Sequence, residues 1–497
     1  MIWYRSRMSM YVSTRDTAEQ AYPYSHAAVE GLDRDTGGLF VPRLTPVFSE
    51  ATLQSFVDQP TVTIFTETKS LFAGDSIPTD VIHRIAEESY SKANFPYAEN
   101  GIITPLDELQ PGIYKLRLSD GPTGSFKDQA LLPLGGELDF FMAKIRRMMA
   151  MLGGTSGDTG SSGESSIKGR ERLWLAMLSP KNGMAPFQSA QMGALSGGNI
   201  LNISVEGAFD DCQRIVKALK RTDEFGGFGA VNSINWARIA SQVPYWISGY
   251  LQACEGEVGK PVDFVVPSGN FGNALAGYIA RSMGVPIRRI IIATNENSVL
   301  DELIQTGNYR RRDSQITSSP SMDIGEASNY ERLAFDVLER DPTRLKAYMG
   351  KFATGGEVRF EDFGLPNNYL QKFMNFDSGV STHQDRLATI LEIFKASGNK
   401  TVIDPHTADA VTVAMRKQQH GVPIVCLETA LPVKFDATIK EALGFVPKRT
   451  DPRFIGLEER VDAEQTFRRA ENSPEAVADI LREELALAGL SSYVARG

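Results

Sequence analysis

Lys127 is the residue whose neighbours most favour chemistry. It lies in GPTGSFKD (121–128), where small residues precede it and Asp128 follows it. Glycines let a backbone approach a ligand closely. A lysine held in such a turn and partly removed from water has a lowered pKa, which makes the neutral, nucleophilic amine available. Since most lysines are solvated surface groups, this segment alone leaves both interpretations open.

A second segment, MLGGTSGDTGSSG (151–163), alternates glycines with hydroxyl side chains around Asp158. One interpretation is a flexible loop. The other is a set of backbone N–H groups and hydroxyls that surrounds an anion such as a carboxylate. Asp158 could in addition accept a hydrogen bond from a ring hydroxyl.

The segment PSGNFGN (267–273) follows an apolar run, Phe264 to Val266, and precedes a helical pattern. A glycine-rich turn at a helix N-terminus directs N–H donors and the positive end of the helix dipole at a phosphate. The spacing fits neither a dinucleotide fingerprint nor a Walker loop. It therefore favours one phosphate on a small cofactor over a plain strand-to-helix turn.

Two further segments contain polar residues that could meet a ligand. In VNSINWARIASQ (231–242), Asn232, Ser233 and Arg238 could converge on a second anion, because arginine suits phosphate and carboxylate. In CLETALPVKF (426–435), Thr429 ends a predicted strand, where its hydroxyl could meet a ring nitrogen. The structural alternatives are a surface ion pair for the arginine and ordinary β-propensity for the threonine.

The elements that would position these residues follow an α/β rhythm. Phe264–Val266 and Ile290–Ala293 are predicted strands on either side of a helix, which indicates a parallel sheet. Residues 385–398 predict an amphipathic helix with Leu387, Ile390, Leu391 and Phe394 on one face and Gly398 as its stop. Residues 472–489 predict another, with Ser473 as N-cap and Pro474 in the first turn.

Composition sets the broad class. The chain has 497 residues, ample for a large core, and a net charge of −9, which argues against nucleic acid or a membrane surface as partner. Its three cysteines are far apart and neither they nor the five histidines form a metal motif, so we expect reduced thiols and no metal. No apolar run reaches membrane-spanning length, so we expect a cytoplasmic protein.

Together these segments resemble the threonine synthases of the long bacterial and fungal type, within the tryptophan-synthase-β-like fold of pyridoxal phosphate (PLP) enzymes. The resemblance runs from Tyr11 to Phe435. Besides the segments above, it rests on YVSTR (11–15), GGLFVP (37–42), FQSAQM (187–192), AFDDCQ (208–213), TNEN (294–297), SPSMDI (319–324), SNYER (328–332) and DPHTAD (404–409).

The resemblance implies an α/β fold of type II, with two α/β subdomains and parallel-type sheets around a cofactor cleft. We expect an N-terminal cap domain at 1–100, a smaller subdomain at 101–230 and a larger one at 231–497. It also implies a PLP-dependent lyase that converts O-phospho-L-homoserine and water to L-threonine and phosphate. The partner would be this small amino-acid substrate, and the chain a monomer or homo-oligomer.

The resemblance also implies roles for individual residues. Lys127 would be the catalytic lysine and hold the cofactor as a Schiff base. The remaining cofactor-binding positions would be Asp158 at the 3′-oxygen, Thr429 at the ring nitrogen, and Gly269, Asn270, Phe271, Gly272 and Asn273 around the phosphate. The positions expected to bind the substrate carboxylate and phosphate are Ser156, Thr159, Asn232, Ser233 and Arg238.

The sequence departs from the family pattern close to these residues. Asp120 and Leu431 stand where the family commonly has histidine, and Gly124 and Ser125 replace Leu-Ala before the Phe-Lys-Asp motif. Ser161, Ser162 and Gly163 follow TSGDTG in place of a start with Ala-Ala. Asp120 near a phosphate pocket would oppose a dianionic substrate. Two alternatives stay open. One is a related PLP-dependent enzyme, either a phospholyase that releases phosphate, 2-oxobutyrate and ammonia or an elimination or replacement enzyme on another amino acid, and the other is a non-catalytic homologue.

Overall fold

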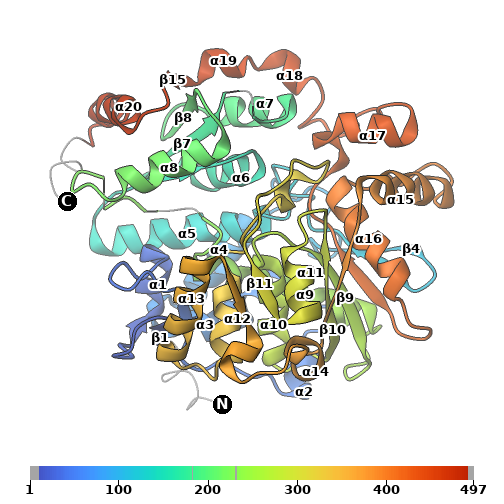
Figure 1. The fold of residues 1–497 in the computed structure, drawn as a ribbon. Coiled ribbons are helices and arrows are strands. Elements are labelled where there is room, and N and C mark those ends of the chain that lie inside the picture. The colour runs from blue at the N-terminus through green and yellow to red at the C-terminus, as the bar shows by residue number, and fades with distance from the viewer. Residues whose placement is uncertain (1–9, 182, 226, 230–231, 491–497) are drawn as a thin grey trace.

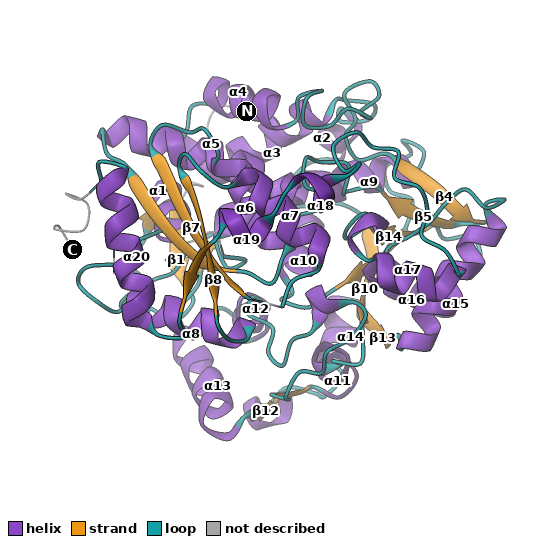
Figure 2. Cartoon of the chain, turned by 90° about the horizontal axis from the view of Figure 1, so that it is seen from above, coloured by secondary structure: helices purple, strands orange, loops and turns teal. Residues whose placement is uncertain are grey.

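The computed structural model describes residues 10–181, 183–225, 227–229 and 232–490. Two sheets organise this part of the chain, one of four strands and one of six. Figure 1 shows the four-stranded sheet and its helices above the six-stranded one, and Figure 2 shows the two sheets side by side from above. Parallel strands require long crossovers, which the helices supply.

The six-stranded sheet has the order β13-β10-β9-β14-β5-β4. Its strands are β4 (Leu106–Gln110), β5 (Ile113–Leu116), β9 (Val262–Pro267), β10 (Ile287–Thr294), β13 (Phe376–Val380) and β14 (Ile424–Leu427). All neighbours are parallel except β4 and β5, which pair antiparallel. The carboxyl ends of β9 and β14 therefore lie at one edge, and the loops that follow them meet there.

Helices cover both faces of this sheet. One face, with Phe264 and Ile290, packs against α9 (Trp236–Ala253) and α10 (Gly272–Ser282). The other face, with Val265 and Ile291, packs against α15 (His383–Ala396) and α16 (Pro405–Lys417). This alternation explains why the strands are apolar at consecutive positions, as in sheets buried on both faces.

The four-stranded sheet is parallel and has the order β15-β8-β7-β6. Its strands are β6 (Met149–Gly154), β7 (Leu173–Pro180), β8 (Ile200–Val205) and β15 (Arg468–Ala470). The helices around it are α5 (Asp128–Ile145), α6 (Asp158–Ile167), α7 (Pro186–Leu195), α8 (Phe209–Leu219) and α20 (Pro474–Leu487). The C-terminal part thus returns to this sheet, as the red ribbon along the top of Figure 1 shows.

The N-terminal part forms a three-stranded antiparallel sheet of the order β2-β1-β3, followed by helices. Its elements are β1 (Met10–Ser13), β2 (Tyr22–Pro23), α1 (Tyr24–Glu30), β3 (Phe40–Pro42), α2 (Glu50–Gln54), α3 (Thr61–Ala73) and α4 (Thr79–Ser89). The other helices and strands are α11 (Val299–Thr306), β11 (Asn308–Arg310), α12 (Tyr330–Val337), α13 (Pro342–Gly355), β12 (Glu357–Arg359), α14 (Tyr369–Met374), α17 (Asp436–Leu443), α18 (Leu457–Arg460) and α19 (Ala463–Thr466).

The predicted local elements are found at the expected places. Ser473 caps α20 by accepting a hydrogen bond from the Ala476 N–H at 3.1 Å. The buried face of α15 differs from the predicted one, because it includes the guanidinium of Arg386 as well as Ile390 and Ile393.

The domain limits stay a prediction. Strands β4 and β5, which lie within the predicted smaller subdomain, belong to the six-stranded sheet. Strand β15, which lies within the predicted larger subdomain, belongs to the four-stranded sheet. No helix in the described ranges is long and apolar enough to cross a membrane.

A buried ion pair joins the N-terminal helices to the rest of the core. Lys69 of α3 lies 2.8 Å from the Glu137 carboxylate of α5, and both side chains are almost wholly buried. Lys69 also donates to the Ser241 hydroxyl of α9 at 2.9 Å, and Tyr24 of α1 donates to Glu137. One lysine therefore connects α1, α3, α5 and α9.

We predict that Lys69→Met lowers the free energy of unfolding by about 3–5 kcal/mol, because Glu137 is left buried without its cation. Urea denaturation followed by circular dichroism measures the loss. The double variant Lys69→Met/Glu137→Leu removes both charges and should lose less than the single variant. If the double variant were the less stable of the two, the ion pair would not be the cause.

Candidate active site

The turn that carries Lys127 is fixed by the residue after it. The buried Asp128 carboxylate accepts hydrogen bonds from the Thr123 N–H at 2.9 Å, the Thr123 hydroxyl at 2.7 Å and the Ser162 hydroxyl at 2.6 Å. A Cβ on Gly121 would lie 2.5 Å from this carboxylate. The glycine is therefore needed for the turn to close on Asp128. Lys127 is the residue immediately before α5.

The same turn pairs with the segment that follows β14. The Phe126 N–H donates to the Thr429 carbonyl at 3.0 Å, and the Leu431 N–H donates to the Gly124 carbonyl at 3.0 Å. Thr429 is buried, with 6% of its surface exposed. The backbone thus keeps the predicted catalytic lysine and the predicted ring-nitrogen contact next to each other.

Asp158 is the carboxylate that Lys127 faces. It is the first residue of α6, and its Oδ2 lies 3.6 Å from Lys127 Nζ. Its Oδ1 accepts hydrogen bonds from Lys434 Nζ at 2.8 Å and from Gln188 Nε2 at 2.9 Å. Ser321, which follows β10 in the chain, donates to Oδ2 at 3.5 Å. Asp158 therefore joins groups from both sheets.

Burial and charge act on these groups in opposite directions. Burial alone would raise the pKa of the Asp158 carboxyl, but the Lys434 and Lys127 ammonium groups outweigh it and hold the pKa well below its usual range. Burial lowers the pKa of Lys127; Asp158 opposes this, while Lys434 and Arg238 add to it. The site thus combines an ionised carboxylate with an amine whose pKa lies below that of a free lysine.

The loop after β9 has the geometry expected of a phosphate cradle. Phe271 adopts a left-handed backbone with φ of 62°, and α10 begins at the next residue, Gly272. The first N–H groups of a helix have no acceptor within it. A Cβ on Gly269 would lie 3.0 Å from the Met322 Cα, so a larger residue would press the 319–324 loop outward. The buried Ser268 hydroxyl has no partner among the described residues.

SNYER connects this loop to the second predicted anion site. Asn329 donates from its side chain to the carbonyls of Asn270 at 3.1 Å and Ser233 at 3.2 Å. Ser328 lies 3.4 Å from the Ser233 hydroxyl and donates to the Asn270 side chain at 3.3 Å. The segments NSINWAR and SGNFGN are therefore adjacent, as the two predicted anion sites require.

The other predicted residues differ in how they are placed. Arg238 is buried on α9 and acts electrostatically on Lys127. The Asn273 side-chain oxygen accepts hydrogen bonds from Tyr245 and Trp246, which fixes the orientation of this amide. Four predicted substrate residues have no hydrogen bond to Lys127 in the described ranges: Ser156, Thr159, Asn232 and Ser233.

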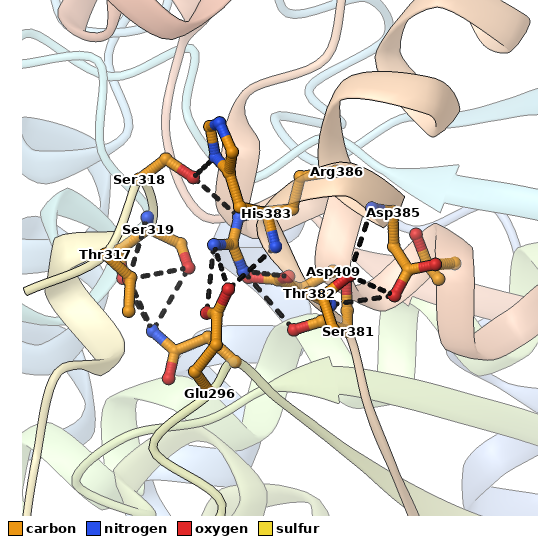
Figure 3. Close-up of polar contacts among 12 residues, drawn as sticks. Glu296, Thr317, Ser318, Ser319, Ser381, Thr382, His383, Asp385, Arg386 and Asp409 are labelled. Carbon is orange, nitrogen blue, oxygen red and sulfur yellow. Dashed lines mark hydrogen bonds and ion pairs between the residues drawn. The ribbon is translucent and has the colours of Figure 1, made fainter. Parts of the chain in front are cut away.

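The loop that carries Ser321 is held by a polar network around Arg386 (Figure 3). This fully buried guanidinium donates to Glu296 at 2.9 Å, Asp409 at 3.0 Å and the Ser318 hydroxyl at 2.7 Å. Burial raises the pKa of Asp409 to about 7, although Arg386 acts against the shift. One side chain therefore fixes the loops after β10 and β11 to each other and to α16.

A buried histidine fixes Ser321 itself. His406 Nε2 accepts the Ser321 N–H at 3.0 Å, and its Nδ1 lies 2.8 Å from the Asp404 carboxylate. Nδ1 therefore carries the proton in the neutral tautomer that this arrangement favours.

The sequence alone predicted no role for five residues of the site: Lys434, Gln188, Ser321, His406 and Arg386. The first four lie within quoted family motifs, which was the signal for them.

Two departures from the family pattern have a structural explanation. The buried Asp120 carboxylate lies 2.6 Å from the Arg117 guanidinium, so its charge is compensated within the turn. Leu431 packs with Phe187 and Phe454 in a small apolar cluster. Arg453, just before Phe454, donates to the carbonyls of Asp120 at 3.2 Å and Gly121 at 3.0 Å.

Two mainly parallel sheets that share a partly buried lysine, an ionised carboxylate and a glycine-rich loop at a helix start define a PLP enzyme of fold type II. The threonine synthase of Corynebacterium glutamicum is 42% identical to this chain over 487 residues, which is 96% of this chain and 98% of that protein. The chain therefore belongs to the threonine synthase family, and the predicted family and fold class are confirmed.

Other comparisons agree. Family models described as "Threonine synthase N terminus" and "Threonine synthase, C-terminal" match residues 10–90 and 407–481. The threonine synthase of Methylobacillus glycogenes is 43% identical over 452 residues, 88% of this chain and 93% of that one. The PLP-bound threonine synthase of Brucella melitensis has a TM-score of 0.87 and 33% identity, covering 96% of this chain and 99% of its own. The yeast enzyme gives 0.87 and 31%, with the same coverage.

We predict that, in the cofactor-free protein, Lys127 reacts with an amine reagent with an apparent pKa below the roughly 10.4 of a free lysine. Asp158→Asn should lower this pKa further, because the carboxylate stabilises the ammonium form. Mass spectrometry of the labelled peptide across a pH series measures it, with exposed Lys144 as internal reference for the reagent. An unchanged or higher pKa in the variant would contradict the assigned ion pair.

Proposed function

We propose that this chain is a PLP-dependent threonine synthase that converts O-phospho-L-homoserine and water to L-threonine and phosphate. The observation that carries the proposal is the partly buried Lys127 amine, 3.6 Å from the ionised Asp158, in a chain of this family. A lysine with a lowered pKa can bond covalently to a carbonyl cofactor and can transfer protons.

The residues present fit the cofactor. Lys127 would bind it covalently, and Asp158 and Thr429 would contact the 3′-oxygen and the ring nitrogen. The phosphate would meet the N–H groups of the 269–273 loop and the unpartnered Ser268 hydroxyl. When bound, PLP supplies an electron sink for negative charge that develops next to the substrate amino group.

The chain's own groups would supply position and proton transfer. Lys127 Nζ, when neutral, would accept the proton from the substrate Cα. It would have to pass this proton back to the bound substrate and cofactor before it could accept a second one from Cβ. The buried Arg238, together with Ser156, Thr159, Asn232 and Ser233, would bind the substrate's carboxylate and phosphate. Compensation of Asp120 by Arg117 removes the repulsion that its charge would otherwise exert on this dianionic substrate.

The location and assembly belong to the same proposal. A reducing compartment, such as the cytoplasm, is supported by three buried cysteines that form no disulfide among the described residues. The partner is a small amino-acid substrate, and either a monomer or a homo-oligomer fits this role.

Product analysis tests the reaction. We expect the PLP-loaded protein and O-phospho-L-homoserine to give phosphate and threonine in equal amounts by NMR. Lys127→Ala should lower turnover by about 10²- to 10⁴-fold through lost proton transfer alone, whereas Lys144→Ala, an exposed lysine, is the matched control. Phosphate with 2-oxobutyrate would identify an eliminating lyase, and no phosphate would mean another substrate.

The Thr429 hydroxyl should leave the cofactor's ring nitrogen largely unprotonated. Thr429→Asp places a carboxylate there, which favours the protonated nitrogen. We expect a shift of the visible absorbance band of the bound cofactor and more transaminated side product, while Thr429→Ser keeps the parent spectrum. Identical spectra and products in all three proteins would remove Thr429 from this role.

A further inference from the structure

Lys434 is a buried lysine that the proposed reaction does not use. It ends a short 3₁₀ turn, Pro432–Lys434, five residues after Thr429 along the chain. Its side chain is 0% exposed, and its Nζ lies 2.8 Å from Asp158 Oδ1. In the part of the chain that the structure describes, Asp158 is the one acceptor of its ammonium group. Burying a lysine costs free energy unless it is paired, so the contact needs an explanation.

Asp158 lies between two amines, one on each oxygen. Lys127 approaches Oδ2 at 3.6 Å and Lys434 binds Oδ1 at 2.8 Å. The proposed reaction requires a neutral Lys127 amine. With Lys127 neutral, Asp158 alone would be a buried, uncompensated carboxylate, and such a group takes up a proton instead of staying ionised. It would also repel an electron-rich ring oxygen, since an ionised carboxylate only accepts hydrogen bonds.

We propose that Lys434 is a positioning residue: it is the permanent counter-ion of Asp158, which stays ionised and compensated when Lys127 is neutral. An ammonium group carries three donors, and one of them is used on Asp158. The pair presents the ligand with a net neutral unit. The inference rests on the proposed function, because that function is what requires Lys127 to lose its charge.

The charges around Lys127 come from four elements. Asp158 belongs to α6, Arg238 to α9 and Lys434 to the turn after β14. Asp128 of α5 adjoins Lys127; burial raises its pKa, and Lys434 is among the groups that act against that rise. Lys434 and Arg238 both disfavour the charged form of Lys127, and Asp158 favours it. Removing Lys434 leaves Asp158 free to stabilise the Lys127 ammonium, so the amine should hold its proton to higher pH.

The first experiment uses the cofactor-free protein, so that it does not depend on the proposed reaction. Lys434→Met should raise the apparent pKa of Lys127, measured by pH-dependent labelling, by one unit or more. This is a tenfold or greater loss of labelling rate at a fixed pH below that pKa. Lys434→Arg keeps the charge and should restore the parent value to within a few tenths of a unit.

Two variants control for structural effects. Gln188→Met removes the other 2.9 Å hydrogen bond to Asp158 Oδ1 without changing charge, and should shift Lys127 less than Lys434→Met does. Lys69→Met removes another fully buried, paired lysine and should destabilise the fold without moving Lys127. An unchanged Lys127 pKa in Lys434→Met, or equal shifts in Lys434→Met and Lys434→Arg, would overturn the proposal. If Lys434→Met fails to fold, Lys434→Gln takes its place in the same comparison.

The second experiment uses the PLP-loaded protein. In Lys434→Met, the pH at which the visible absorbance of the bound cofactor changes should move upward, because a nearby positive charge has been removed, and Lys434→Arg should reverse the move. Lys434→Met could shift the Lys127 pKa in the cofactor-free protein while the parent protein binds no PLP. That result would contradict the proposed function and leave the role of Lys434 standing. A cofactor that binds with the same pH dependence in all variants would overturn the role of Lys434.

Discussion

The ionised Asp158 carboxylate, buried between Lys127 and Lys434, is the interaction on which the rest of the site depends. A buried carboxylate stays charged only when opposite charges and hydrogen-bond donors surround it. Here the donors come from α7, the turn after β14 and the 319–324 loop, while the carboxylate comes from α6. The requirement to satisfy one charge therefore brings the two sheets to a fixed relative position at the site, and the lysine amine shares that environment.

Several buried polar residues around the Asp158 site hold loops that have no regular backbone hydrogen bonding of their own. Arg386 joins the loops after β10 and β11 to α16, and His406 fixes the backbone of Ser321. Asn329 does the same for the loops at 232–235 and 268–271. Each uses a fully hydrogen-bonded buried polar group, which rigidifies its surroundings more than apolar packing would. The family motifs TNEN, SPSMDI, SNYER and DPHTAD contribute residues to these contacts.

The sequence predicted the elements with strong local signals. The Ser473 cap, the Gly398 stop and the apolar strands around 264 and 290 depend on neighbours within a few residues, and the structure confirms them. Lys434 and Arg386 could not be found in this way, because a charged side chain in a helical or turn pattern predicts exposure. Their partners are remote: Lys434 pairs with Asp158 across 276 positions of the chain. Only the tertiary fold supplies the charges that make their burial favourable.

The return of the C-terminal part to the smaller sheet has a consequence for biosynthesis. Arg453 holds the carbonyls of the catalytic turn, and β15 covers the edge of β8. While a ribosome is still translating these residues, the emerging β8 presents an unpaired edge, the kind that recruits other chains. The nascent protein thus has an open edge and an unsupported turn until residues 453–470 emerge. This one segment completes both, so competence for catalysis would be acquired nearly at once.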